Sequence, residues 1–342
     1  MTIPVGIVGC GTMAAIHANA YRAVGARLVG IAGGNRERGT ALARAHGIRW
    51  FADLGEMLDS CRPAAVSVTV PNACHYMVSL QALERGIAVL CEKTQAATEQ
   101  ESRALLHDVR RLGGRFQIGY MKRFHPVVRR FAEWVGELAE LGGIDSGHLS
   151  CHQAMVRWPG DLHLFPPEQG GGILKHGGSH TLDLLLWVLG AAPTHVTAVT
   201  STLDEAQVER RASGLLEFGS GAHVTMELSW SPLTQSGPFG TGWDETIMLR
   251  SVAGIAALTL VNWRHSATLR PRASIHRRAT GRTEQFETAP FDWFLAEIRA
   301  FLCAVEDGTP CVPDAADGYL TDLTIHTCYR SAAEGRRVPV PW

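Results

Sequence analysis

A short apolar run at residues 3–8 leads directly into the glycine-rich motif G-C-G-T-M-A at 9–14 and then into a helix-compatible stretch at 15–23. This order of strand, glycine turn and helix constrains the fold more than any other feature of the chain. Gly9 allows a tight turn, Gly11 lets the backbone approach a pyrophosphate, and the alanine that ends the motif permits close packing of helix on strand. Because a helix N-terminus attracts anions, the motif predicts a dinucleotide site. The expected cofactor-binding residues here are Gly9, Gly11, Thr12 and Met13.

Composition narrows the class of protein. The 342 residues are enough for two domains, and 46% of them are hydrophobic, so a sizeable core can form. Thirty-two basic residues balance 33 acidic ones, which argues against nucleic acid or an anionic membrane as partner and favours a small molecule. No apolar run is long enough to span a bilayer, and the N-terminus lacks the features of a signal peptide. The eight cysteines form no C-x-x-C pair, so we expect free thiols and a cytoplasmic protein.

Hydrophobic patterning divides the chain into two parts. The first part alternates expected strands at 28–32, 65–70, 87–91 and 116–120 with expected helices at 37–46, 75–85 and 97–112. Such alternation predicts a parallel sheet covered on both faces. From about residue 146, strand-like runs follow one another at 148–155, 195–202, 215–218, 224–230, 246–251 and 256–261, and helical patterns return at 292–306 and 315–334. This second part predicts an antiparallel sheet.

The end of the second strand bears on the choice of nucleotide. Gly33 stands where an acidic residue would bind the ribose of NAD, and Asn35, Arg36 and Arg38 follow it. A small residue with two arginines behind it leaves room and charge for a 2′-phosphate, which favours NADP over NAD. In the alternative interpretation, the two arginines only face water.

Two further groups of residues carry candidate chemistry. Lys93 follows an apolar strand and emerges where ligands bind in such sheets, so it could hold a substrate hydroxyl during hydride transfer. If the segment after the triple glycine 170–172 is helical, His176, His180 and Asp183 share one face. These residues could form an acid–base site, a metal site or a set of core histidines. A metal is disfavoured because Gly177–Gly178 weakens the helix and no third strong ligand is evident.

The chain resembles the glucose-fructose oxidoreductase, inositol dehydrogenase and rhizopine-catabolism (Gfo/Idh/MocA) family over nearly its whole length. The residues that carry the resemblance are the motif at 9–14 with His17, Val70-Pro71-Asn72 with His75, Cys91-Glu92-Lys93, Arg123-Phe124-His125-Pro126, the triple glycine with His180 and Asp183, and the closing motifs at 329–331 and 335–338. The resemblance implies an α/β protein with an N-terminal Rossmann domain (1–122) and a C-terminal α+β domain with a large open, mainly antiparallel sheet (123–342). The C-terminal helices would be able to pack back on the first domain.

The resemblance also implies roles for single residues. Lys93 matches the lysine of the family's Glu-Lys-Pro motif beside the reacting carbon, and His180 matches the histidine that exchanges the hydroxyl proton. Residues 34–38 are similar to the NADP-contacting loop of glucose-fructose oxidoreductase. The resemblance adds five residues to those expected to bind the cofactor: Pro71, Asn72, His75, Glu92 and Lys93. The full set of residues expected to bind substrate is Lys93, Arg123, Trp158, His176 and His180. Trp158 is included because it follows the first strand of the second part of the chain, and a tryptophan packed in the core is the alternative.

Two departures from the family pattern matter. Thr94 replaces the motif's proline, so the backbone that presents the lysine could be set differently. His176 stands where many members carry an aspartate, so proton transfer must be tuned without that fixed negative charge. His176 could join a proton relay, or the reaction could be a ketone or imine reduction. The arginine-rich stretch 263–282 is expected to be a solvated sheet edge, with a phosphate site or an acidic neighbouring subunit as the alternative.

The resulting expectation is an NADP-preferring oxidoreductase that transfers hydride between nicotinamide and a carbinol or carbonyl carbon of a sugar, cyclitol or related small molecule. We expect a homodimer or homotetramer formed through the C-terminal sheet, and neither nucleic acid nor membrane as partner. One alternative is an enzyme that retains its nucleotide and uses transient oxidation for elimination, epimerisation or glycoside cleavage. A second alternative is a nucleotide-sensing regulator, which the presence of both Lys93 and His180 disfavours.

Overall fold

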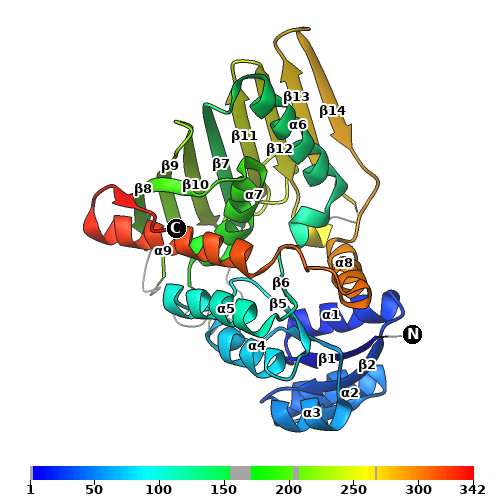
Figure 1. Ribbon diagram of the computed structural model, residues 1–342. Helices are drawn as coiled ribbons and strands as arrows, with labels where there is room; N and C mark the ends of the chain where they lie inside the picture. The colour runs from blue at the N-terminus through cyan, green and yellow to red at the C-terminus, as the bar shows by residue number, and fades with distance from the viewer. Residues whose placement is uncertain (1–2, 155–170, 203–207, 266–267) are drawn as a thin grey trace. The chain divides into compact units, whose positions relative to one another are not determined.

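The computed structural model describes residues 3–154, 171–202, 208–265 and 268–342. The chain divides into two compact units, which are described separately (Figure 1). Unit 1 comprises Met1–Met121 and Phe294–Tyr319, and unit 2 comprises Lys122–Trp293 and Leu320–Trp342. Within the described ranges, no helix combines the length and apolar character needed to cross a membrane.

Unit 1 is built on a parallel sheet whose described strands lie in the order β3-β2-β1-β4-β5-β6. The strands are β1 (Pro4–Val8), β2 (Arg27–Ala32), β3 (Arg49–Phe51), β4 (Ala65–Val68), β5 (Ala88–Cys91) and β6 (Phe116–Ile118). β4 and β5 are buried throughout because helices cover both faces of a parallel sheet. The strand order reverses between β1 and β4, and ligands of such sheets bind at the carboxyl ends of the strands beside this reversal.

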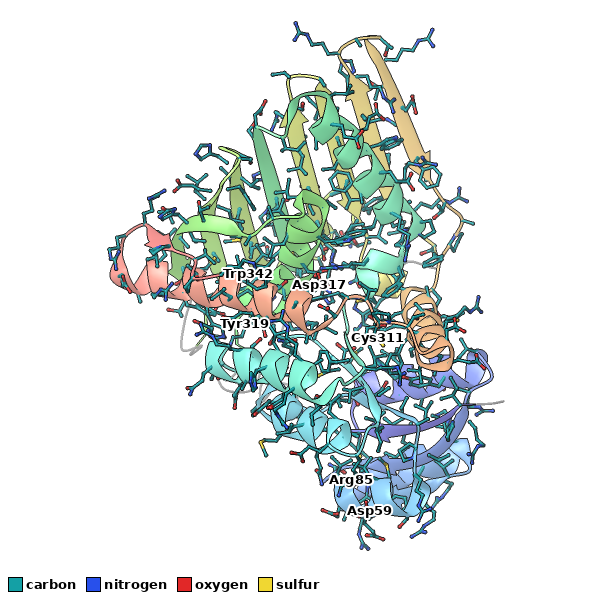
Figure 2. All side chains as sticks on the ribbon, viewed as in Figure 1. Asp59, Arg85, Cys311, Asp317, Tyr319 and Trp342 are labelled. Carbon is teal, nitrogen blue, oxygen red and sulfur yellow. The ribbon has the colours of Figure 1, made fainter. Side chains whose placement is uncertain are left out.

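The helices of unit 1 begin in different ways, some of them at a residue whose side chain caps the helix. They are α1 (Thr12–Ala23), α2 (Arg36–His46), α3 (Leu54–Cys61), α4 (His75–Leu83), α5 (Glu99–Leu112) and α8 (Trp293–Asp307). Thr98 and Glu101 form a capping box at the start of α5. Helix α8 packs on α1 in one core cluster that also contains Cys311. Arg85, just after α4, donates a hydrogen bond to Asp59 of α3 at 3.1 Å on the surface of unit 1 (Figure 2).

Unit 2 contains a mixed sheet whose described strands lie in the order β14-β13-β12-β11-β7-β10-β9-β8-β15. The strands are β7 (Ser146–Ala154), β8 (Pro193–Ser201), β9 (Arg211–Phe218), β10 (His223–Ser231), β11 (Trp243–Ser251), β12 (Gly254–Leu260), β13 (Arg272–Arg277), β14 (Arg282–Glu287) and β15 (Val338–Pro339). Among these, β7 and β10 pair in parallel, and the other neighbours are antiparallel. On β10, buried and exposed residues alternate, so one face of the strand is covered and the other is open.

Helices α6 (Pro126–Gly142) and α7 (Ser179–Leu189) cover one face of this sheet (Figure 1). A π-helical turn, η4 (Leu174–Gly178), leads directly into α7. Helix α9 (Ala315–Glu334) begins in unit 1 and continues in unit 2, where Ser331 accepts a hydrogen bond from the backbone of Ala198 in β8.

The structure confirms the predicted fold class, a parallel α/β sheet followed by a mainly antiparallel one, and adds elements that we did not predict. These are β3, α3, α6, β13, β14 and β15. The arginine-rich stretch contributes β13 to the sheet next to the edge strand β14. Within it, Arg277 forms ion pairs with Glu137 of α6 and Glu284 of β14.

Candidate active site

The glycine turn after β1 has the geometry of an anion-binding site. Gly9 has φ +124°, and a Cβ atom there would lie 2.5 Å from the Thr69 hydroxyl oxygen, so only glycine fits. Around Gly11, a Cβ atom would meet no described atom within 4 Å, which leaves the approach to α1 open. No described side chain caps the N-terminus of α1, and its first turn contains no acidic residue. Its amide groups can therefore donate to a diphosphate, and the turn fits a dinucleotide.

No carboxylate lies between the end of β2 and the start of α2, and Arg36 and Arg38 lie in the first turn of α2 on either side of Glu37. The side chain of Asn35 caps α2 by accepting the backbone N–H of Arg38 at 2.9 Å. The guanidinium of Arg36 lies over the Trp50 ring, 5.3 Å from its centroid. The indole N–H of Trp50 in turn donates to the Gly33 carbonyl at 3.2 Å. Trp50 thus connects the strand end to the arginine that follows it, a contact that sequence reasoning missed because Trp50 lies in the unpredicted strand β3.

The loop after β4 places Pro71, Asn72 and His75 at the same sheet edge. Pro71 precedes a short 3-10 helix, Asn72–Cys74. His75 is fully buried, and its ring nitrogens face two backbone carbonyls, that of Thr94 at 2.6 Å and that of Val70 at 2.8 Å. Burial lowers the pKa of His75. These contacts tie the loop after β4 to the loop after β5.

Thr94 has contacts that a proline could not make. Its hydroxyl accepts from the Asn72 amide at 2.9 Å and donates to the Ala96 carbonyl at 3.0 Å. The carbonyl of Thr94 faces His75. The Lys93–Thr94 peptide bond is cis. The departure from the family motif is therefore accompanied by a set of hydrogen bonds that fix the chain directly after Lys93.

On the other side of Lys93, Glu92 belongs to a buried polar group. Its Oε1 lies 3.0 Å from Nε2 of His17 on α1, and its Oε2 accepts the Lys93 backbone N–H at 3.3 Å. Nδ1 of His17 lies 3.0 Å from the Ser67 hydroxyl, and the Tyr21 hydroxyl lies 2.9 Å from the same oxygen. Burial pushes the pKa of Glu92 upward, but the hydrogen bond from His17 and the neighbouring positive charges outweigh it and hold this pKa below its usual value. Ser67 and Tyr21 were not predicted, because nothing in their local pattern distinguishes them from core residues.

In unit 2, the predicted histidine segment is held closely against the sheet. A Cβ atom on Gly177 would lie 2.3 Å from the Gln153 side chain, and one on Gly178 would lie 2.6 Å from Leu228. These glycines therefore allow η4 to approach β7 and β10. A π-helical turn of this kind often marks a functional site. The ring of His176 packs edge-on against Trp230, with centroids 5.7 Å apart.

Gly172, the last residue of the triple glycine, packs against Glu209, a residue that sequence reasoning missed. A Cβ atom on Gly172 would lie 2.1 Å from the Glu209 carbonyl oxygen. The Glu209 carboxylate accepts the Leu174 backbone N–H at 2.9 Å and the Tyr329 hydroxyl at 2.9 Å. Burial raises the pKa of Glu209. Glu209 thus anchors the start of the segment that carries the two histidines.

Asp183, predicted on one face with the histidines, pairs with Arg123. The Arg123 guanidinium donates two hydrogen bonds to the Asp183 carboxylate, at 2.9 and 2.5 Å, and both side chains are buried. His180 is also buried, on the first turn of α7. In the part of the chain that the structure describes, no group of three metal-binding side chains surrounds the histidines. Trp158, the remaining predicted substrate residue, lies outside the described residues.

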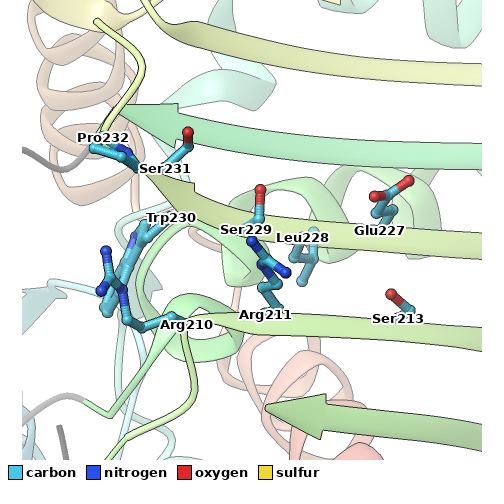
Figure 3. Close-up of a pocket in the computed structure, with 9 residues that line it drawn as sticks. All are labelled: Arg210, Arg211, Ser213, Glu227, Leu228, Ser229, Trp230, Ser231 and Pro232. Carbon is cyan, nitrogen blue, oxygen red and sulfur yellow. The ribbon is translucent and has the colours of Figure 1, made fainter. Parts of the chain in front are cut away.

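A pocket of about 490 Å³ lies along β9 and β10 (Figure 3). It includes Trp230, which also contacts His176. Its lining residues are Arg210, Arg211, Ser213, Glu227, Leu228, Ser229, Trp230, Ser231 and Pro232. The lining combines guanidinium groups, hydroxyls and the Glu227 carboxylate.

A parallel sheet with an uncapped helix after the glycine turn of β1, and a lysine at the end of β5 two strands away, is typical of dinucleotide-dependent proteins. Comparison with known proteins supports this class. Residues 3–120 match the GFO/IDH/MocA oxidoreductase family with an NAD-binding Rossmann fold, and residues 136–238 match the GFO/IDH/MocA C-terminal domain. The chain belongs to this oxidoreductase family.

Individual relatives are similar along most of their length. Inositol 2-dehydrogenase 1 of Saccharopolyspora erythraea is 27% identical, covering 99% of this chain and 97% of the relative. D-xylose 1-dehydrogenase (NADP(+)) 2 of Haloferax volcanii is 29% identical, covering 80% and 79%. The crystal structure of GenD2 from gentamicin A biosynthesis, in complex with NAD, is 25% identical with a TM-score of 0.82 and covers 100% of this chain and 97% of that one.

Proposed function

We propose that the protein is a nicotinamide-dependent dehydrogenase of a polyhydroxylated small molecule such as a sugar or cyclitol. The observation that carries the proposal is the position of Lys93 at the end of β5, fixed by hydrogen bonds on both sides and close in sheet order to an open diphosphate turn. The names of the relatives, which include an inositol and a xylose dehydrogenase, support this substrate class.

We assign a separate role in hydride transfer to each of the following residues. When bound, the nicotinamide supplies the hydride acceptor or donor. Lys93 binds and polarises the substrate oxygen, and His180 takes or returns the hydroxyl proton. His176 stands four residues before His180 and serves as its partner in proton transfer. Because Arg123 already pairs with Asp183, we assign this arginine to the support of α7 rather than to direct substrate binding.

Replacement of Lys93 tests this role. Lys93→Met removes the ammonium group while leaving the glycine turn intact, so nucleotide affinity should stay within about tenfold and turnover should be abolished. Lys93→Arg is the matched control that keeps the charge but changes the geometry. A Lys93→Met enzyme with normal turnover would remove this lysine from the mechanism.

We further propose that NADP is the preferred nucleotide. Gly33 leaves the ribose site without a carboxylate, and Arg36, supported by Trp50, and Arg38 provide positive charge for a 2′-phosphate. The relatives include one named as NADP-dependent and one with NAD bound, so the preference depends on this chain's own residues. Arg36→Ala with Arg38→Ala should weaken NADPH binding far more than NADH binding, and equal losses would refute the assignment.

We place the enzyme in the cytoplasm as a homodimer or homotetramer formed through the sheet of unit 2. All eight cysteines are free thiols, as in a reducing compartment. The open face of β10 provides a surface for self-association. Light scattering during gel filtration measures the mass directly, and a monomer at micromolar concentration would refute the oligomer.

A further inference from the structure

Five polar side chains of unit 1 are buried around Glu92, the residue before Lys93, and the burial of one of them needs an explanation. The five are His17, Tyr21, Ser67, Glu92 and Glu297, each no more than 8% exposed. Glu297 lies on α8 and is completely buried. Neither of its carboxylate oxygens has a hydrogen-bond partner among the described residues. A buried acid without a partner requires an explanation, since an ionised carboxylate there would be very costly.

The hydrogen-bond directions in this cluster follow from what each group can donate. Glu92 as a carboxylate can only accept, so Nε2 of His17 must donate to it. In a neutral ring, Nδ1 then accepts from the Ser67 hydroxyl, and Ser67 must accept from Tyr21. Burial raises the pKa of Tyr21, which keeps this first donor protonated. Three hydrogen bonds in series therefore end on one oxygen of Glu92.

Two buried carboxylates near one another cannot both be charged at low cost. Glu92 has donors on both oxygens, whereas Glu297 has none among the described residues. Burial raises the pKa of Glu297 well above its usual value, and the charge of Glu92 raises it further. The other titratable groups that act on Glu92 are His17 from α1, His75 from α4 and Lys93 itself.

We propose that Glu92 is a positioning residue for Lys93, kept as an anion by the Tyr21–Ser67–His17 chain, while Glu297 holds the proton that the pair cannot both release. Glu92 affects Lys93 in two ways. Its Oε2 fixes the Lys93 backbone N–H, and its negative charge favours the ammonium form of the lysine side chain. This inference rests on the proposed role of Lys93 as the group that binds the substrate oxygen.

The sequence makes the ionisation of Lys93 directly measurable. The chain contains only three lysines, Lys93, Lys122 and Lys175. Lys122 is buried in an ion pair with Glu245, and Lys175 is 7% exposed, whereas Lys93 is partly exposed. A trace amount of acetic anhydride, followed by peptide mass spectrometry, therefore reports Lys93 with the N-terminal amine as internal reference. The midpoint of the labelling curve against pH is the quantity to compare.

Two variants of the same shape distinguish the two carboxyl groups. Glu92→Gln should move the labelling midpoint of Lys93 to lower pH by about 1 unit, because an opposite charge is lost. Glu297→Gln imitates the protonated acid and should leave the midpoint unchanged. Tyr21→Phe removes the first donor of the chain but leaves the Glu92 charge in place at the pH where a lysine titrates, so it should leave the midpoint unchanged.

Several outcomes would overturn the proposal. An unchanged midpoint in Glu92→Gln would show that its charge does not act on Lys93, and a shift in Glu297→Gln as large as in Glu92→Gln would show that Glu297 is ionised. If Glu92→Gln does not fold, Glu92→Ala removes the same charge and provides the same comparison. The labelling does not depend on turnover. An active Lys93→Met enzyme would refute the role proposed for Lys93 in turnover, and an unshifted midpoint would refute the action of the Glu92 charge on Lys93.

Discussion

The buried pair of Arg123 and Asp183 allows a quantitative test of the structure. Arg123→Met would leave the Asp183 carboxylate buried, at 1% exposure, without its guanidinium partner. Breaking a buried ion pair from one side typically costs about 3–5 kcal/mol. In a unit of roughly 200 residues, each kcal/mol lowers the melting temperature by about 2–4 °C. We therefore expect the transition of unit 2 to fall by about 10 °C.

The double variant Arg123→Met with Asp183→Val removes both charges. It should unfold at a higher temperature than Arg123→Met alone, because no uncompensated charge remains buried. Differential scanning calorimetry at neutral pH measures all of these transitions, with the surface variant Arg130→Met as control. If Arg123→Met melts like the wild type and instead only raises the KM of a substrate, Arg123 binds substrate and the structural interpretation is wrong.

Three other predictions follow from single residues. Burial lowers the pKa of both His125 and His326 to about 4. Because each side chain is neutral at pH 7, the folded state has its full stability there. The free energy of unfolding declines as pH falls below about 6.5, by about 3 kcal/mol for each histidine at pH 4. Melting curves between pH 7 and 4 test this, and His326→Gln should reduce the slope. Gly9→Ala should abolish nucleotide binding, measured by nucleotide fluorescence, because its φ of +124° and close packing exclude a side chain. Trp50→Leu should reduce the NADPH-over-NADH ratio of affinities by releasing Arg36, and an unchanged ratio would contradict the support assigned to the tryptophan.

Much of unit 1 could be predicted from the sequence because its signals are local. Apolar runs of four to six residues alternate with amphipathic helices, and the glycine motif fixes the first turn. The three-residue strand β3 is too short to produce a periodic signal. Helix α6 was missed although its buried residues recur at helical spacing, with Phe131, Val135 and Leu138 on one face. That pattern was available in the sequence and should have been recognised.

The site was harder to predict, because its partners are distant in sequence. A strand end and a helical spacing indicate Lys93 and His180 as candidates, whereas Glu297 lies more than 200 residues from Glu92 and no local pattern connects the two. Asp183 was predicted beside the histidines, but nothing local indicates that Arg123 takes both of its oxygens. The π-helical turn could not be foreseen either, since it depends on the close approach of Gly177 to Gln153 in the sheet.

The central claim is that this chain transfers hydride between a nicotinamide and a polyhydroxylated molecule with the help of Lys93. The most direct measurement incubates wild-type and Lys93→Met proteins with NADP or NAD and a panel of inositols, aldoses and glycosides, and follows the absorbance of reduced nucleotide. We predict that both proteins bind nucleotide and that only the wild type reduces it with a member of the panel. A wild-type protein that binds neither nucleotide, or a Lys93→Met variant that reduces nucleotide equally fast, would contradict the account.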